Sequence, residues 1–334
     1  MGRRGLAIIA TGLLTLALSG CTSQKAGSGD QPADGGKIKV GLVTKTDSNP
    51  YFVALRDSAK AEAEKNGAEL VALAGKFDGD NEGQVAAIEN LVQQGAKAIL
   101  ITPSNSTGIL GAIKKARDRG VLVIALDTET DPKDAVDATF ASDNTEAGRM
   151  QGMYVKAALA ATPPKLIMLD GTPGSTVSEQ RHNGFLEGIG LKAGDPAILG
   201  VEATNGEQNK AQTATENLLQ RDTTLTAVYT LNEPAARGAY GALQAKGLAT
   251  RVVIGSIDGS CQGVTDVKDN KVVATVMQFP KKMAAQGVQA ALEFARSGKK
   301  PAGFVNTGVS VITDQAVPGI QSQDTAWGLQ NCWG

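Results

Sequence analysis

The chain has 334 residues, of which 20% are charged and 42% hydrophobic, and its formal net charge is −1. This length is sufficient for two domains, and a near-neutral charge without a basic block argues against nucleic acid as a partner. The single histidine, His182, excludes a histidine-rich metal site, and no cysteine pair has zinc-ligand spacing, so we expect neither metal nor cofactor.

Residues 1–20 are expected to be a signal peptide that is not part of the fold. Arg3 and Arg4 precede an apolar segment, 6–18, that is too short to span a bilayer. The following Leu-Ser-Gly-Cys21 matches the lipobox of bacterial lipoproteins, in which the cysteine thiol carries a diacylglycerol; a cleaved signal without lipid is the alternative. Removal of two arginines from a net charge of −1 leaves −3.

The next stretch, 21–36, is rich in Gly, Ser, Gln and Asp and is expected to be a lipidated flexible tether. We therefore expect an exported protein that is attached by its lipid to the outer face of the cell membrane, without crossing it.

The first folded stretch, 37–52, combines a short β-branched run with a helix start. Pro50 suits the first helical turn, and Ser48 or Asn49 can cap its free amides. Tyr51 and Phe52 follow directly, at a strand-to-helix corner. Flat rings beside amide and hydroxyl groups suit a polar ligand with apolar faces, such as a sugar, although Phe52 in the core is the simpler alternative.

Strand and helix patterns alternate from residue 38 to residue 312. The apolar run 121–126 is typical of a parallel strand that is buried on both faces, and the same rhythm restarts after Asn144 with a helix over 145–161. The last strand is expected over Val305–Ile312. The pattern predicts an α/β fold of two doubly wound parallel-sheet units in series.

Several strands are followed by a polar side chain at their carboxyl end, where ligands bind in open parallel sheets. These residues are Asn49, Asp127, Asn232, Asp258 and Gln278. Two lobes with facing strand ends would enclose a polar cleft. For each aspartate, capping of the next helix is the alternative.

At this level of detail the chain resembles the type I periplasmic sugar-binding proteins of ABC importers, in the ribose-binding group. The matching stretches are Ser48-Asn-Pro-Tyr-Phe52, Ile101-Thr-Pro-Ser104, Val123-Ile-Ala-Leu-Asp127, Ala141-Ser-Asp-Asn144, Arg181-His-Asn-Gly-Phe185, Ala227-Val-Tyr-Thr-Leu-Asn232, Gly255-Ser-Ile-Asp-Gly259 and Ala274-Thr-Val-Met-Gln278. The resemblance implies a non-enzymatic monomer that binds a monosaccharide between its lobes and presents it to an importer permease.

The resemblance also implies two lobes joined by three crossings, near Ser142, Gln278 and Thr313. The first lobe would then comprise residues 37–142 and 279–312, and the second lobe residues 143–278 and 313–334. A bound sugar would close the lobes about this hinge.

Residue by residue, the resemblance implies that the first lobe contacts the sugar through Asn49, Tyr51, Phe52 and Asp127. The second lobe and hinge would contribute Asn232, Asp258 and Gln278. Carboxylates suit this role because they accept pairs of hydroxyl donors.

Three departures from the ribose binders put ribose in doubt. Thr128 replaces an arginine beside the first-lobe aspartate. Glu179 stands where another arginine is found, with Arg181 two positions further on, and both are candidate ligand contacts. Gly206 and Glu207 replace an aromatic residue. Lys45 is a candidate for the missing cation.

The chain looks most like the fructose-binding members, through Lys76-Phe-Asp-Gly-Asp-Asn81, Leu126-Asp-Thr-Glu-Thr-Asp-Pro132 and Arg181-His-Asn-Gly184. D-Fructose is therefore the expected ligand. Ribose, another pentose or hexose, or a polyol are alternatives, as is a sensor that signals through a membrane receptor.

Two cysteines remain beyond the lipobox, Cys261 and Cys332. The exported compartment permits a disulfide that would attach the C-terminal tail to the Cys261 loop, but free thiols are equally compatible with the sequence.

Asp78, Asp80, Glu82, Gly83 and Glu89 have the spacing of an EF-hand-like calcium loop. Glu82 is unusual at its position, however, and the helix expected from Gly83 would carry Glu89 away. We therefore favour an acidic helix N-cap.

An enzyme on the same fold is a weaker alternative. The sequence lacks a Gly-x-Ser-x-Gly nucleophile elbow, and the pair Asp127 and Asp258, which is suited in principle to a glycosidase, coincides with binding positions. The lipobox and the missing helix-turn-helix motif argue against a sugar-responsive repressor.

Overall fold

The computed structural model of the protein describes residues 36–334. Residues Lys37–Gly334 form one compact unit. The predicted signal peptide, the lipidation site Cys21 and the tether up to residue 35 lie outside the described residues. Within residues 36–334, the helices are too short or too polar to cross a membrane.

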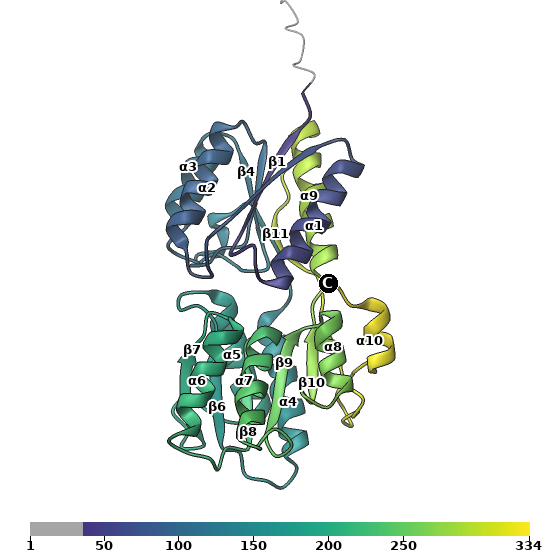
Figure 1. The fold of residues 1–334 in the computed structure, drawn as a ribbon. Coiled ribbons are helices and arrows are strands. Elements are labelled where there is room, and N and C mark those ends of the chain that lie inside the picture. The colour runs from purple at the N-terminus through teal and green to yellow at the C-terminus, as the bar shows by residue number, and fades with distance from the viewer. Residues whose placement is uncertain (1–35) are drawn as a thin grey trace, which may run out of the picture. The chain divides into compact units, whose positions relative to one another are not determined.

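The first sheet has the strand order β11-β5-β4-β3-β1-β2, and all its neighbouring strands are parallel (Figure 1). Its strands are β1 (Lys39–Thr44), β2 (Glu69–Ala74), β3 (Ala98–Ile101), β4 (Leu122–Leu126), β5 (Ala138–Ala141) and β11 (Gly303–Asn306). The wholly apolar β4 is buried along its length because helices cover both faces of the sheet.

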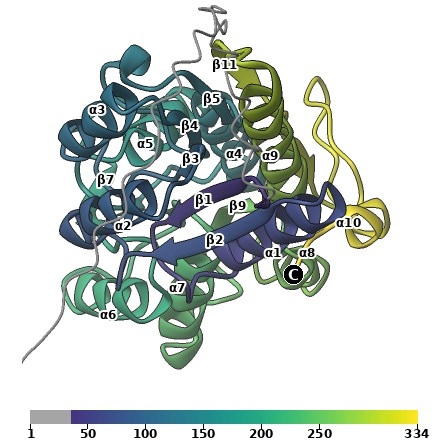
Figure 2. The same cartoon turned by 90° about the horizontal axis from the view of Figure 1, so that it is seen from above.

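Helices α1 (Pro50–Lys65) and α9 (Pro280–Ser297) pack on one face of this sheet. Helices α2 (Asn81–Gln93) and α3 (Leu110–Asp118) pack on the other (Figure 2). A short 3-10 helix, η1 (Lys133–Ala135), precedes β5. The two apolar clusters formed in this way make up the core of the first lobe.

The second sheet has the strand order β12-β10-β9-β8-β6-β7. All its pairings are parallel except that of β10 with β12, which is antiparallel. Its strands are β6 (Leu166–Asp170), β7 (Ile198–Ala203), β8 (Ala227–Thr230), β9 (Val253–Asp258), β10 (Ala274–Met277) and β12 (Ser310–Ile312).

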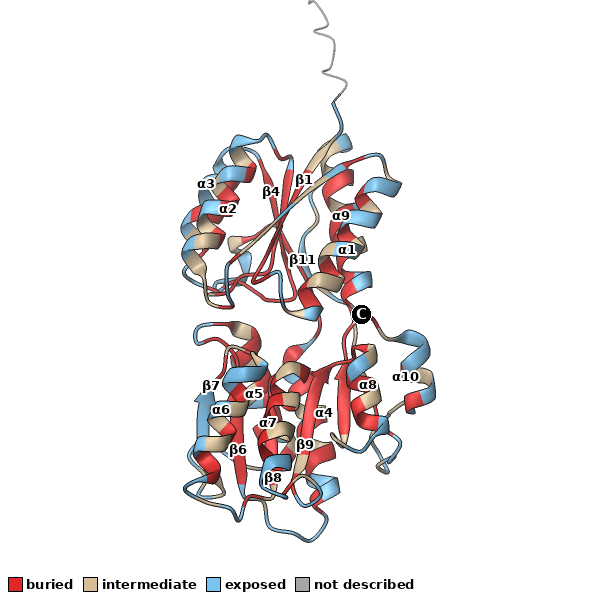
Figure 3. Cartoon of the chain, viewed as in Figure 1, coloured by how far each residue is buried: buried red, intermediate tan, exposed pale blue. Residues whose placement is uncertain are grey.

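Helices cover both faces of the second sheet as well. One face carries α4 (Asn144–Leu159) and α5 (Thr176–Ile189), and the other carries α6 (Gln208–Leu219) and α7 (Glu233–Ala245). The central strands are buried, and the outer faces of the helices are exposed (Figure 3). Two shorter helices, α8 (Cys261–Lys268) and α10 (Thr325–Asn331), pack together beside β10 and β12. The predicted two doubly wound α/β units are confirmed.

The prediction of one strand over Val305–Ile312 is wrong. The segment forms β11 in the first sheet and β12 in the second, and Gly308, with a φ of 88°, lies in the connection. We therefore propose that the third crossing lies between Asn306 and Ser310, before the expected position at Thr313. The proposed crossings near Ser142 and Gln278 fall between β5 and α4 and between β10 and α9.

Candidate functional site

Loops that follow the carboxyl ends of the two sheets meet between the lobes. Lys45, just after β1, donates from Nζ to Ser175 Oγ at 3.3 Å. Thr172, after β6, donates from Oγ1 to Asp78 Oδ1 at 2.7 Å, and Ser106 N donates to Gly174 O at 2.9 Å. These hydrogen bonds join the lobes directly, so the strand ends of both sheets contribute to one interface.

The corner between β1 and α1 has the predicted form. Asn49 is the N-cap of α1, and its Oδ1 accepts from Tyr51 N at 3.0 Å, while Pro50 occupies the first turn. Tyr51 and Phe52 are buried with their rings edge to face, 5.6 Å apart. Lys45 Nζ lies 6.0 Å from the centre of the Phe52 ring. Burial raises the pKa of Tyr51 well above its usual value, and the nearby carboxylates Asp127 and Asp258 add to the rise.

Asp127 follows β4 with an unusual φ of 63° and is buried. Its Oδ2 accepts from Thr128 Oγ1 at 2.9 Å. Thr128 therefore occupies the place of the missing arginine as a neutral donor to this carboxylate.

The second lobe brings three of the predicted residues together. Gln278 Nε2 donates to Asp258 Oδ1 at 3.0 Å, and Arg181 Nη1 lies 3.8 Å from the same oxygen. Arg181 also donates from Nε to Asn144 Oδ1 at 2.8 Å and from Nη1 to Leu231 O at 3.0 Å. These contacts fix the guanidinium beside Asp258.

Asp258 itself has a φ of 146° and is 4% exposed. Burial raises the pKa of this carboxyl to about 8, against the opposing charge of Arg181; the nearby Glu233 and Asp127 raise it further. The carboxyl is thus able to donate as well as accept near neutral pH.

Asn232 is the N-cap of α7. Its Oδ1 accepts from Ala235 N at 3.0 Å, and its Nδ2 donates to Gly206 O at 3.2 Å. Glu179 differs from the other candidates because it is exposed in the first turn of α5. Its expected ligand role is not supported, whereas Arg181, two positions further along α5, is buried beside Asp258.

Two buried residues at the site were not predicted. Glu233 accepts from Gly259 N at 2.7 Å, Ser260 N at 3.2 Å and Thr275 Oγ1 at 2.8 Å, as well as from Ser260 Oγ. It thereby holds the loop that follows Asp258. In the sequence, this glutamate resembles an ordinary acidic first-turn residue of a helix.

The second unpredicted residue is Trp333. Its indole packs edge to face on Tyr51, with ring centres 5.4 Å apart, and it is 3% exposed. The available signal in the sequence was its position next to Cys332. The structure joins Cys332 to Cys261 in a disulfide, with Cα atoms 4.9 Å apart, which confirms that predicted alternative.

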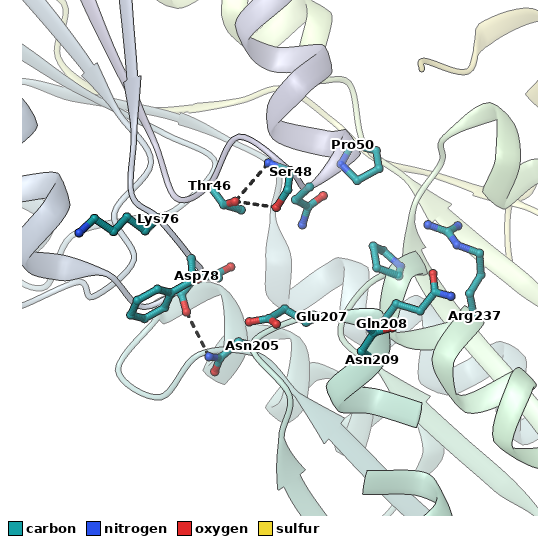
Figure 4. A pocket seen from close by; sticks show the side chains of 14 residues that line it. Thr46, Ser48, Pro50, Lys76, Asp78, Asn205, Glu207, Gln208, Asn209 and Arg237 are labelled. Atoms are coloured by element: carbon teal, nitrogen blue, oxygen red, sulfur yellow. Dashed lines mark hydrogen bonds between the residues drawn. The ribbon is translucent and has the colours of Figure 1, made fainter. Parts of the chain in front are cut away.

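A cavity of about 530 Å³ is lined by residues of both lobes (Figure 4). The first lobe contributes the loop with Lys76 and Asp78, and the second contributes the loop with Asn205 and Glu207 together with Arg237 of α7. Among the predicted ligand residues, Asn49 alone lines this cavity. The buried candidates Tyr51, Phe52, Asp127 and Asp258 are therefore not part of its lining.

The acidic stretch around Asp78 has the predicted N-cap role. Asp80 caps α2, and its carboxylate accepts from Gly83 N and Lys76 N, both at 2.9 Å. These backbone hydrogen bonds lower the pKa of Asp80. Glu89 pairs with Lys115 at 3.1 Å. Among residues 36–334, no group of three or more His, Cys, Asp or Glu side chains is placed to hold a metal ion.

Comparison with known proteins identifies the class. The periplasmic binding protein domain model matches residues 40–300. The ribose import binding protein of Salmonella typhimurium is 33% identical, over 80% of this chain and 88% of that protein.

Solved structures agree with the sequence comparison. An ABC transporter periplasmic solute-binding protein from Actinobacillus succinogenes with bound D-allose is 26% identical, with a TM-score of 0.74, covering 83% of this chain and 98% of its own. The Caulobacter myo-inositol binding protein is 27% identical, with a TM-score of 0.77, and the match covers 84% and 94% of the two chains.

The chain therefore belongs to the periplasmic binding protein family. Within that family it is a type I sugar-binding protein of the ribose-binding group, as predicted from the sequence. It is a binding protein and not an enzyme.

Proposed function

We propose that this protein captures a monosaccharide between its two lobes and delivers it to the permease of an ABC importer. The observation that supports the proposal is the buried cluster at the interface, where the rings of Tyr51 and Phe52 lie near Asp127, Asp258 and Arg181. A sugar presents C–H faces to rings and hydroxyls to carboxylates and guanidinium groups.

Each proposed contact follows from the groups that remain available. Asp127 and Asp258 accept from sugar hydroxyls, and Arg181 donates to sugar oxygens. Gln278 Nε2 already donates to Asp258, and its buried Oε1 has no partner among the described residues, so this oxygen accepts from a sugar hydroxyl. Because the oxygens of Asn49 and Asn232 already cap helices, these residues offer their amide N–H groups. Lys45 supplies a cation beside Phe52.

We propose D-fructose as the first candidate ligand, on the three stretches that resemble the fructose-binding members. D-Ribose, another pentose or hexose, and polyols are the alternatives; relatives are named for ribose, D-allose and myo-inositol. Binding involves no chemistry: the ligand shifts the population from open to closed lobes.

We also propose that the protein works outside the cell membrane, attached through lipid on Cys21, as a monomer. The lipobox supports this localisation. A sensor that signals through a membrane receptor uses the same closure, and a permease and an ATPase encoded beside the gene would favour transport.

A thermal-shift screen of residues 22–334 against D-fructose, D-ribose, D-allose and myo-inositol tests the function. A ligand at 100 times its dissociation constant stabilises the folded state by about 2.7 kcal/mol. Asp258→Ala should abolish the shift, whereas Asp222→Ala, at an exposed carboxylate of the same lobe, should retain it.

The pattern of the shifts separates the ligands. A shift with D-fructose alone supports the fructose assignment, and a shift with another sugar or a polyol discards it but keeps sugar binding. Absence of a shift with these four compounds and with a wider panel of pentoses, hexoses and polyols contradicts the proposed function.

A further inference from the structure

The C-terminal end of the chain is held against the loop that follows β9. Cys332 is bonded to Cys261, and Trp333 forms a bridge with Ser260 in which its carbonyl accepts from Cys261 N at 3.0 Å. The disulfide and the backbone hydrogen bond therefore hold Trp333 beside Ser260 and Cys261, which follow Asp258 by two and three residues. This placement buries an aromatic side chain that would otherwise lie in an exposed tail.

The indole of Trp333 contacts both halves of the proposed site. Its Nε1 is shared between two carbonyl oxygens of the second lobe and hinge, Asp258 O at 3.1 Å and Gln278 O at 3.2 Å. Its ring packs against Tyr51 of the first lobe. These contacts link the backbones of Asp258 and Gln278 to the ring of Tyr51, and all three residues are proposed to contact the sugar.

We propose that Trp333 is a positioning residue for sugar binding. It aligns the Asp258 and Gln278 side chains through their backbone carbonyls and supports Tyr51 from behind, and the Cys261–Cys332 disulfide keeps it in place. This inference rests on the proposed sugar-binding function.

The backbone of Asp258 explains why such support matters. A φ of 146° is a conformation that an aspartate adopts only when its surroundings impose it. Gln278 in turn holds Asp258 Oδ1 through its amide, so a shift of either backbone changes the orientation of the carboxyl group. Trp333 is the one described side chain that holds both carbonyls at once.

The chain offers a matched control in its other tryptophan. Trp327 lies in the same terminal segment, on α10, and packs against the cluster of Val264, Met277 and Ile312. It is half-buried, and its contacts are with this cluster, away from Tyr51. Truncation of Trp327 therefore removes a large terminal ring without touching the proposed positioning contacts.

The experiment measures dissociation constants by calorimetry for D-fructose, D-ribose, D-allose and myo-inositol, with the full exported chain. Trp333→Phe keeps a ring but lacks the N–H donor, and we expect about tenfold weaker binding of the sugar that the wild type binds. Trp333→Ala should weaken binding further, by about a hundredfold. Trp327→Ala should stay within about twofold.

Two further measurements separate positioning from general stability. In Trp327→Phe, Trp333 is the sole tryptophan, and its fluorescence should change when the sugar binds. The double variant Cys261→Ser, Cys332→Ser should bind about tenfold more weakly, because the indole is no longer held.

The outcomes are distinct. Wild-type affinity in Trp333→Phe, or an equal loss in Trp327→Ala, overturns the positioning role and leaves the proposed function intact. If the wild type binds none of the four compounds and no other pentose, hexose or polyol, the proposed function fails, and the inference fails with it. If Trp333→Ala does not fold, Trp333→Phe and the fluorescence measurement decide.

Discussion

Asp258 shows how a single residue at the site is controlled by its environment. The chain buries this carboxyl beside Glu233 and Asp127, and burial is the main reason why its pKa is raised to about 8. One positive group, Arg181, lies 3.8 Å away and opposes this rise. A protonated carboxyl donates a hydrogen bond, so the ligand-free site can present Asp258 as both donor and acceptor near neutral pH.

This raised pKa makes stability depend on pH. Between the unfolded value near 3.9 and the folded value of about 8, the folded state binds more protons than the unfolded state, so the free energy of unfolding falls as pH rises. Asp258→Asn removes the contribution of this carboxyl, while Glu233 and Asp78, whose pKa values burial also raises, keep theirs. Between pH 5 and pH 8, the free energy of unfolding should therefore fall by up to about 4 kcal/mol more in the wild type than in the variant.

Denaturant unfolding at pH 5 and pH 8 checks the expectation. Asp222→Asn is the control, because the pKa of this exposed carboxyl is lowered by hydrogen bonds from Thr224. Parallel pH profiles for Asp258→Asn and the wild type would contradict the burial argument.

Asn49, Tyr51 and Asp127 were chosen on a local signal, because each lies at or shortly after the carboxyl end of a strand. Their role as sugar contacts stays a prediction. Trp333 was missed because its indole partner Asp258 lies 75 residues earlier in the chain. Only the packed fold brings the two together.

At the scale of elements, the helix pair α4 and α5 determines where Arg181 lies. Four glycines form the contact, Gly148 and Gly152 on α4 and Gly184 and Gly188 on α5. A methyl group on any of them would collide with a backbone carbonyl oxygen of the partner helix. The close approach of these two backbones therefore requires glycine, and Arg181 O is itself one of the atoms in contact.

Gly184→Ala tests this packing. The added methyl would meet Thr145 O, so the helices must separate, which should cost about 1–3 kcal/mol of stability. Sugar affinity should also fall, because α5 carries Arg181. Thermal unfolding and calorimetry measure the two effects.

Gly111→Ala, on α3, is the matched control. No atom lies within 4 Å of its would-be methyl group, and we expect stability to be unchanged or to rise by about 0.5–1 kcal/mol. Tolerance of Gly184→Ala with normal affinity would show that the α4–α5 contact does not position Arg181.

Most elements were predicted because hydrophobic periodicity and glycine or proline boundaries are local signals. The error at β11 and β12 has a physical cause. Both strands are short, and three intervening residues carry the chain from one sheet to the other. Strand propensity alone contains no information about which sheet a strand joins.

For the whole of residues 37–334, the sequence predicted two lobes but could not indicate how they meet. The structure has them in direct contact through side chains far apart in sequence, such as Asp78 with Thr172 and Glu129 with Gln180, at 2.7 Å and 2.6 Å. In the proposed mechanism, such pairs form only in the closed form of the lobes. If the sugar binds the closed form, part of its binding free energy is used to close the lobes. The apparent affinity therefore rises with the fraction of protein that is closed before the sugar binds.

Thr172→Val tests this coupling. Thr172 donates to Asp78, a carboxyl that is 8% exposed and whose pKa burial raises. Without the donor, the closed form buries an acceptor with one partner fewer, at a cost of about 1 kcal/mol, whereas in an open form water would replace the lost bond. Sugar affinity should therefore fall by about fivefold, mainly through faster dissociation.

Thr215→Val is the matched control, because this buried hydroxyl donates to Ala211 O at 2.7 Å within α6, inside one lobe. The change removes one hydrogen bond inside a single lobe and no contact between lobes, so affinity should stay within about twofold. Stopped-flow dissociation and calorimetry on both variants distinguish the cases. Equal losses of affinity would mean that global stability controls binding, and unchanged dissociation in Thr172→Val would mean that Asp78 and Thr172 do not contribute to closure.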